Sequence, residues 1–213
     1  MYASLHNHTE RSNIRLLDAI NRPAISLGFS GIAITDHESL SCAVELLHIR
    51  DKIKEEHPDF KIVFGNEIYL VGQKEMEEYV QWRPQEGGPE KPDFRFYHFI
   101  LWAKDAIGFQ QLKELSSRAW GRSFMFRGQR RCPTFYTDIE EVVAPNKGHL
   151  MCATACLGSE LAKAVLDMDG AHVKRFLMWM IQNFGKENVR LELQVSDSEE
   201  QIKYNSYQLK LSK

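Results

Sequence analysis

Short apolar runs rich in β-branched and aromatic residues alternate along this chain with longer amphipathic segments, and this alternation restricts the possible folds most. Repeated strand-then-helix units require right-handed crossovers, which place helices on the outside of a parallel sheet. We therefore expect an α/β fold whose sheet closes into a barrel. The expected strands cover residues 2–8, 31–35, 61–71, 96–103, 149–155 and 189–195, and the expected helices cover 16–27, 41–56, 107–120, 159–167, 171–184 and 199–211.

The composition is that of one ordinary globular domain. The chain has 213 residues, 43% hydrophobic and 26% charged, so it can bury one sizeable core, and no stretch is apolar and long enough to cross a bilayer. Its net charge of -2 argues against nucleic-acid binding by bulk electrostatics, so any such contact requires a local patch. Because the N-terminus has no basic segment followed by an apolar one, and four cysteines are too few for a disulfide scaffold, we expect a cytoplasmic protein.

Two groups of histidines follow the first two apolar runs. His6 and His8 alternate across Asn7, and His37 follows Asp36 at the end of the second run. Side chains two residues apart point to the same face of an extended strand, so His6 and His8 can reach one cation. His37, from the neighbouring strand, could complete the group. Asp36 could fix one of these imidazoles from behind or, equally well, hold a turn.

Three more potential ligands lie in or directly after later strand runs: Glu67, His98 and Cys156. Singly, each has an ordinary structural explanation as a strand-edge carboxylate, a core histidine or a small buried thiol. Together they are harder to explain without a metal, because the carboxyl ends of parallel strands gather at one mouth of a barrel and burying so many titratable groups is costly. Zinc, manganese and iron accept this mixture of imidazole, carboxylate and thiolate.

Two segments interrupt the alternation. Residues 81–93 are rich in proline, glycine and charge, which fits a surface loop that could act as a lid, contact a partner or be a simple insertion. Residues 121–133 combine arginines with aromatic residues, a mixture that can hold a phosphate backbone and stack a base, although solvated loop arginines are the more common explanation. These arginines are Arg122, Arg127, Arg130 and Arg131.

A series of motifs runs in a fixed order along nearly the whole chain: His6-Asn7-His8, Ile34-Thr35-Asp36-His37, Gly65-Asn66-Glu67, Tyr97-His98 and Cys156-Leu157-Gly158-Ser159-Glu160-Leu161. In order and spacing this series resembles the PHP (polymerase and histidinol phosphatase) domain. The resemblance is closest to the PHP domain at the amino end of the bacterial or phage DNA polymerase III alpha subunit. That branch is favoured by the cysteine motif, by Tyr204-Asn205 and by the stretch Leu101-Trp102-Ala103-Lys104-Asp105-Ala106-Ile107-Gly108-Phe109.

This resemblance implies a distorted seven-stranded β/α (TIM-like) barrel over residues 1–213, whose mouth binds up to three divalent metals: zinc, manganese or iron. The family also places a ligand downstream of its first motif, and Asp18 is the best match, with capping of the following helix as the alternative. The segment before Asp18 is longer here than in typical polymerase members. The metal ligands that the resemblance implies are His6, His8, Asp18, His37, Glu67, His98 and Cys156.

The end of the chain departs from the family pattern. Family members complete the metal site with an Asp-x-His motif on a last strand, which follows a helix resembling residues 204–213. We therefore expect a barrel truncated before its last strand and lacking two ligands. A shortened chain would explain this, and so would a naturally split gene with the missing piece supplied by another chain. Either would leave an open edge that invites pairing with another segment.

The resemblance implies a metal-dependent phosphoesterase acting in DNA replication, in which the metals lower the pKa of a bound water and neutralise charge during in-line attack. The expected activity is 3′-5′ exonuclease hydrolysis at the single-stranded 3′ end of DNA. The expected partners are the remaining polymerase domains or a C-terminal complement and a proofreading subunit, with no membrane. Nucleotidyltransferase activity would belong to the whole polymerase that contains this domain and not to the domain itself. The alternatives are a non-catalytic, metal-stabilised structural module and a histidinol-phosphatase-like enzyme acting on a small phosphate monoester.

Overall fold

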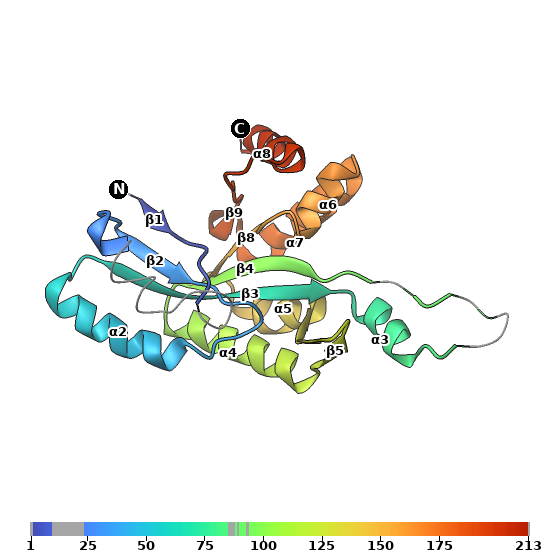
Figure 1. Cartoon of the computed structure of the whole chain (residues 1–213), viewed down its shortest axis with the longest axis horizontal. Coiled ribbons are helices and arrows are strands. Elements are labelled where there is room, and N and C mark those ends of the chain that lie inside the picture. The colour runs from blue at the N-terminus through green and yellow to red at the C-terminus, as the bar shows by residue number, and fades with distance from the viewer. Residues whose placement is uncertain (1, 10–23, 85–87, 89, 93, 213) are drawn as a thin grey trace.

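The fold is built on one seven-stranded sheet with helices packed around it (Figure 1). The structure is a computed structural model that describes residues 2–9, 24–84, 88, 90–92 and 94–212. The strands follow the order β1-β2-β3-β4-β8-β9, and β7 pairs with β3 off this path. Their bounds are β1 (Ala3–Ser4), β2 (Gly31–Ile34), β3 (Lys61–Val71), β4 (Tyr97–Ala103), β7 (Pro133–Phe135), β8 (Leu150–Ala153) and β9 (Val189–Arg190).

A separate hairpin and a set of helices complete the described part of the chain. The hairpin pairs β5 (Phe124–Phe126) with β6 (Gln129–Arg131). Helices from α4 onward contribute to one large core against β3, β4 and β8, and α2 packs against β2 in a smaller one. The helices are α2 (Ala43–Glu56), α3 (Gln73–Gln81), α4 (Ala106–Gly121), α5 (Tyr136–Val142), α6 (Glu160–Leu166), α7 (Gly170–Phe184) and α8 (Glu199–Leu211).

Alternate residues of the central strand β4 face opposite sides of the sheet, and both sides are buried. Phe99 and Leu101 join the large core with the helices, whereas Ile100 and Trp102 join a small cluster on the other side. Alternation with a period of two residues is a property of every strand. Because both faces of β4 are buried, the sequence from Phe99 to Ala103 is an uninterrupted apolar run. We call the side of the sheet that carries Ile100 and Trp102 the inner face.

Most of the expected elements are present, but two expected strands are much shorter. The strand over 61–71 and the helix over 199–211 match β3 and α8, whereas the strand over 2–8 shortens to β1 and the one over 189–195 to β9. In the segment after β9, side chains instead of a neighbouring strand form hydrogen bonds with the backbone. Thr154 Oγ1 accepts the Glu192 N–H at 3.0 Å, and Gln208 donates to the Glu192 carbonyl at 2.7 Å. The expected helix over 16–27 falls mainly outside the described residues.

The expectation of a wholly parallel sheet is wrong, because β4 pairs antiparallel with both β3 and β8. The other pairings between strands of this sheet are parallel. The reversal follows from the connection between β3 and β4. Figure 1 shows α3 beyond the end of β3 instead of against a face of the sheet, and the antiparallel pairing shows that the chain returns to β4 from the end at which it left β3.

The expected barrel is confirmed only in its coarser form, as a mixed α/β fold with a curled sheet. In the described part of the chain, β1 and β9 are the two ends of the sheet and do not pair with each other. The segments that follow them nevertheless approach one another, since His6 Nδ1 lies 2.6 Å from Glu192 Oε1. The sheet therefore curls into a half-barrel whose ends meet through side chains rather than through a ladder.

No helix within the described residues is both long and apolar enough to span a membrane.

One arginine of the 121–133 segment has a structural role. Arg122 donates two hydrogen bonds of 2.8 Å to the carboxylate of Asp138, which also accepts the Phe135 N–H at 2.7 Å. The Arg122 guanidinium lies 4.2 Å from the centre of the Phe135 ring, and the Asp138 side chain is only 6% exposed. A bidentate pair of this kind is strong and geometrically specific. It joins the end of α4 to the start of α5.

We expect Asp138→Ala to lower the free energy of unfolding by about 3 kcal/mol, because it leaves the half-buried Arg122 without its partner. Glu141→Ala is the matched control, since Glu141 pairs with Arg118 at a side chain that is 66% exposed, and it should cost less than about 1 kcal/mol. Urea denaturation followed by circular dichroism measures both values. Equal losses in the two variants would contradict a structural role for Arg122.

Candidate metal centre

The inner face of the sheet carries the centre of the candidate site. In β3, Ile68 and Leu70 join the large core, so the residues that alternate with them, Glu67 and Tyr69, face inward. His98 lies opposite Tyr69 in the antiparallel pairing of β3 with β4, and their rings stack with centroids 4.5 Å apart. The reversed strand β4 therefore brings His98 beside Glu67.

His6 and His8 reach the site from an extended segment that follows β1. Asn7 between them attaches this segment to β2: its carbonyl accepts the Thr35 N–H at 2.8 Å and its side-chain amide donates to the Ala33 carbonyl at 3.0 Å. Since Asn7 faces β2, the histidines on either side both point the other way, into the site. The expected alternation therefore holds although the regular strand has already ended.

His37 follows β2 and forms an isolated bridge with Glu67. Its neighbour Asp36 is buried and binds the chain after His8, because it accepts the Thr9 N–H at 2.6 Å and the Thr9 hydroxyl at 2.7 Å. The Asp36 carboxylate thus makes these hydrogen bonds to a loop and not to an imidazole, which favours the turn-holding alternative for this residue.

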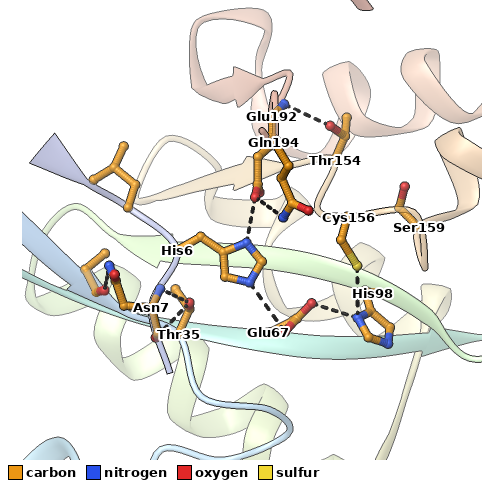
Figure 2. Close-up of polar contacts among 12 residues, drawn as sticks. His6, Asn7, Thr35, Glu67, His98, Thr154, Cys156, Ser159, Glu192 and Gln194 are labelled. Atoms are coloured by element: carbon orange, nitrogen blue, oxygen red, sulfur yellow. Dashed lines mark hydrogen bonds and ion pairs between the residues drawn. The ribbon is translucent and has the colours of Figure 1, made fainter. Parts of the chain in front are cut away.

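The carboxylate of Glu67 lies at the centre of four imidazoles. Oε2 lies 2.7 Å from His37 Nδ1, 3.2 Å from His8 Nε2 and 3.5 Å from His6 Nε2. Oε1 lies 2.8 Å from His98 Nδ1. The Glu67 side chain is 1% exposed, and Figure 2 shows it between His6 on one side and His98 on the other. One buried carboxylate therefore connects residues from four segments of the chain.

These side chains form two groups that could each hold a metal ion and that share Glu67. One comprises His6, His8 and Glu67, and the other comprises His37, Glu67 and His98. Cys156 lies beside the second group, with its sulfur 3.4 Å from His98 Nδ1. Glu67 Oε2 lies beside residues of both groups, and Oε1 lies beside His98 of the second group. A carboxylate placed between two groups of ligands can bridge two divalent cations.

Hydrogen bonding shifts the pKa values of these groups strongly. Burial would raise the pKa of Glu67, but hydrogen bonds from the four histidines hold it far below its usual range. Burial lowers the pKa of His6, but hydrogen bonds to Glu192 and Glu67 outweigh this and raise it to about 10. Burial opposes the shift of His98 too, and hydrogen bonds to Cys156 and Glu67 raise its pKa to about 9. In the metal-free site, protons therefore compensate the buried negative charge.

The residues present fit a metal ion. Two buried polar atoms of this cluster make no hydrogen bond among the described residues: His8 Nδ1 and Glu192 Oε2. Leaving such atoms without partners is costly, and a cation is one way to satisfy a carboxylate oxygen. Moreover, His6 Nε2 and His8 Nε2 are 3.1 Å apart, close to the separation of about 3.3 Å between two ligands of one tetrahedral zinc ion.

The structure adds Glu192, which the sequence patterns did not single out. Its Oε1 contacts His6 Nδ1 at 2.6 Å and accepts a hydrogen bond from Gln194 at 2.8 Å (Figure 2). A carboxylate on the far nitrogen of a ligating imidazole orients the ring and increases its basicity. The signal was present in the alternation Leu191-Glu192-Leu193, which turns Glu192 to the face opposite its apolar neighbours.

Six of the seven predicted ligands lie together at this site, and the seventh is not described. Glu67 contacts His6, His8, His37 and His98, and Cys156 joins through His98. Asp18 lies outside the described residues. Glu67 lies within β3, as the sequence interpretation expected, whereas Cys156 lies three residues beyond β8 rather than at the end of the strand. The curl of the sheet, rather than a common strand end, gathers them.

The comparison with known families agrees with this geometry. The family model of the PHP domain matches residues 4–196. The chain belongs to the PHP domain family. This confirms the resemblance drawn from the motifs. One solved structure, of a Bifidobacterium adolescentis protein assigned to the metal-dependent phosphoesterases, aligns over 57% of this chain and 35% of its own length, with 16% identity and a TM-score of 0.32.

Among curated proteins, this PHP domain is similar to DNA polymerases. It is 39% identical to the probable DNA polymerase YorL of Bacillus subtilis (strain 168) and to the DNA-directed DNA polymerase of Bacillus phage SPbeta, over 94% of this chain. It is 26% identical to the DNA polymerase III subunit alpha of Treponema pallidum, over 95% of this chain. The chain spans 16% of the length of each of these relatives.

We expect the purified chain to retain zinc, manganese or iron, and His6→Ala/His8→Ala to lose about one metal ion per chain, because it removes two of the three ligands of one group. His48→Ala/His57→Ala is the matched control, since both histidines are exposed and lie on or directly after α2. Elemental analysis measures the metal content. Equal metal content in both double variants would exclude the first group as a metal site.

Metal binding should release protons, because a ligating imidazole must be neutral whereas His6 and His98 are protonated at pH 7.5 in the metal-free site. The apparent affinity should therefore rise between pH 7.5 and 9. Glu192→Gln removes one group that raises the pKa of His6. It should therefore reduce the number of protons released per chain on metal binding, by about one at most. Calorimetric titration in two buffers of different ionisation enthalpy measures the number of protons, and no release in the wild type would contradict the expectation.

The same shifts predict how the stability of the metal-free chain depends on pH. A raised pKa in the folded state stabilises the fold below the unfolded value of 6.5, and this contribution is lost as the pH rises through about 9 and 10. We therefore expect the midpoint of urea unfolding of the metal-free chain to fall between pH 7 and pH 10. A midpoint that rises over this range would contradict the assigned shifts.

Proposed function

We propose that this PHP domain is part of a replicative polymerase of the DNA polymerase III alpha type and hydrolyses phosphoesters with divalent metals. The observation that carries the proposal is the Glu67 carboxylate shared by two histidine groups. Two cations held about one bridging carboxylate form a common arrangement for phosphoester hydrolysis. Similarity to DNA polymerases supports DNA as the substrate.

His6, His8 and Glu67 would hold one metal, and His37, Glu67 and His98 the other, with Cys156 beside the second. Bound metals would supply an activated water and neutralise the charge that develops on the phosphate. The protein residues have a separate task, which is to keep the ligands in place. Glu192 orients His6, and Tyr69 supports the second group through its stacked contact with His98 and a 3.3 Å hydroxyl contact with His37.

The substrate that we propose is a single-stranded 3′ end of DNA, cleaved in a 3′-5′ exonuclease reaction that supports replication. The metals that we propose are zinc, manganese or iron, which match the ligand set of imidazole, carboxylate and thiolate. The other domains of a longer polymerase chain and a proofreading subunit would be the partners. A small monoester substrate, as in histidinol phosphatase, is less well supported because the curated relatives named above are polymerases.

A non-catalytic module is the second candidate, and one observation favours it. Glu67 joins the segment after β1, the end of β2 and the strands β3 and β4, so metals at this point would hold the inner face together. Metal binding by the folded state alone adds directly to stability. In this case the site would serve the fold of the polymerase rather than a reaction.

We expect the chain to hydrolyse bis(p-nitrophenyl) phosphate and a single-stranded oligonucleotide with Mn²⁺ or Zn²⁺, and His8→Ala to lower kcat/KM for both by about 100-fold or more. His48→Ala, on the exposed face of α2, should leave both rates unchanged. Metal-dependent turnover would favour the enzyme. A metal-dependent rise in Tm without turnover would reject it and favour the structural module.

A further inference from the structure

A second cleft of about 640 Å³ opens beside the metal centre. It is lined by the segment that leads into β4, by the β5–β6 hairpin and by residues near the start of α6. His98 lines both this cleft and the neighbouring one that contains the other candidate ligands, so the two meet at the second metal group. We call this second space the hairpin cleft.

The hairpin cleft is lined by more positive than negative groups, in contrast to the chain as a whole. Its lining includes four cationic side chains, Arg95, Arg127, Arg131 and Lys163, against two carboxylates, Asp167 and Glu200. Lys163 is already paired with Asp167. Arg131 is paired with Glu38, which does not line the cleft, so the arginines give the lining a modest excess of positive charge in a chain whose net charge is -2. A local patch of this kind is what binding of a polyanion by this chain requires.

Arg131 is held rigidly and close to the metal ligands. Its guanidinium donates to Glu38 Oε2 at 3.2 Å and lies 4.9 Å from the centre of the Tyr69 ring. Tyr69 in turn stacks on His98. One aromatic ring therefore separates a fixed guanidinium from a candidate metal ligand, and a guanidinium is the cation best suited to two-point binding of a phosphate.

Aromatic side chains form one wall of the cleft. Phe126 of the hairpin packs 5.2 Å from both Phe94 and Phe96, measured between ring centroids, and Phe96 lies 6.0 Å from Tyr69. Phe96 and Phe126 remain partly exposed. Partly exposed rings between arginines are suited to stacking an unpaired base while the arginines hold its phosphates.

The hairpin turn places a third cation at the rim. Arg127 and Gly128 both have positive φ, 49° and 80°, as in the tight two-residue turns that match the twist of paired strands. This turn puts Arg127 at the tip, with its guanidinium 5.0 Å from the centre of the Phe126 ring. Arg130, on the same hairpin, donates instead to Ser123 at 3.0 Å and does not line the cleft.

We propose that the hairpin cleft binds one or more nucleotides of single-stranded DNA next to the phosphate that is cleaved at the metal centre. Arg95, Arg127 and Arg131 would hold backbone phosphates, and the ring of Phe126 or Phe96 would stack a base. This inference rests on the proposed function and extends it, because a cleft of this kind selects a chain substrate over a small monoester. It also gives the arginines of residues 121–133 separate roles: Arg122 holds the fold, and Arg127 and Arg131 hold the substrate.

The test measures binding of fluorescein-labelled oligo(dT) of twelve nucleotides to the metal-free chain by anisotropy, in EDTA so that nothing is cleaved. Arg95→Gln/Arg127→Gln changes two exposed cleft residues, and Arg83→Gln/Arg130→Gln is the control of equal charge at exposed positions outside the cleft. We expect Kd to rise about tenfold or more in the cleft variant and less than about twofold in the control. The slope of log Kd against log salt concentration should fall by about 1.4 for two lost phosphate contacts.

Equal weakening in the two variants, or no binding by the wild type, would overturn the cleft proposal, provided that both variants keep the wild-type Tm. Hydrolysis of bis(p-nitrophenyl) phosphate by the wild type separates this outcome from failure of the proposed function. Turnover of that diester with unchanged oligonucleotide binding in the cleft variant would reject only the cleft. Loss of oligonucleotide binding in the cleft variant, with no turnover by the wild type, would support the cleft and reject the phosphoesterase.

Discussion

The buried carboxylate of Glu67 is the group on which the rest of this site depends. It is 1% exposed and lies within 3.5 Å of ring nitrogens from four histidines. A single charge buried in this way is tolerable only if cations compensate it, whether these are protons on imidazoles or metal ions. Because the four histidines come from three segments that are far apart in sequence, the same interaction that creates the site also connects the inner face of the sheet.

The reversed strand β4 makes this convergence possible. An antiparallel neighbour places Tyr69 opposite His98, so the two residues stack and His98 reaches Glu67 from beside it. The curl of the sheet then brings Glu192, which follows the last strand, to His6, which follows the first. The candidate metal ligand His6 and its supporting carboxylate thus meet across the two ends of the sheet. This is how a short half-barrel can surround a site without closing its ladder.

The arginines between α4 and β7 show how one local composition supports two different roles. Arg122 is turned toward α5 and pairs with the buried Asp138, whereas Arg131 is turned toward Tyr69 and the metal centre. In both cases an aromatic ring supports the guanidinium and a carboxylate fixes its direction. Spacing along the chain does not separate these roles, because Arg131 takes its direction from a hairpin whose Phe124 and Phe126 pack against aromatic residues before β4.

Most elements and the candidate ligands could be predicted from the sequence alone: β3 and α8 match their expected bounds, and the six candidate ligands that the structure describes were named from motifs. Local patterns suffice there because apolar periodicity and residue type are properties of short segments. Only the tertiary structure decided that β4 runs against its neighbours, that Asp36 binds a loop, and that Glu192 supports His6. Strand direction and side-chain partners depend on where the connecting segments pack, and the residues involved here lie from 27 to 186 positions apart in the sequence.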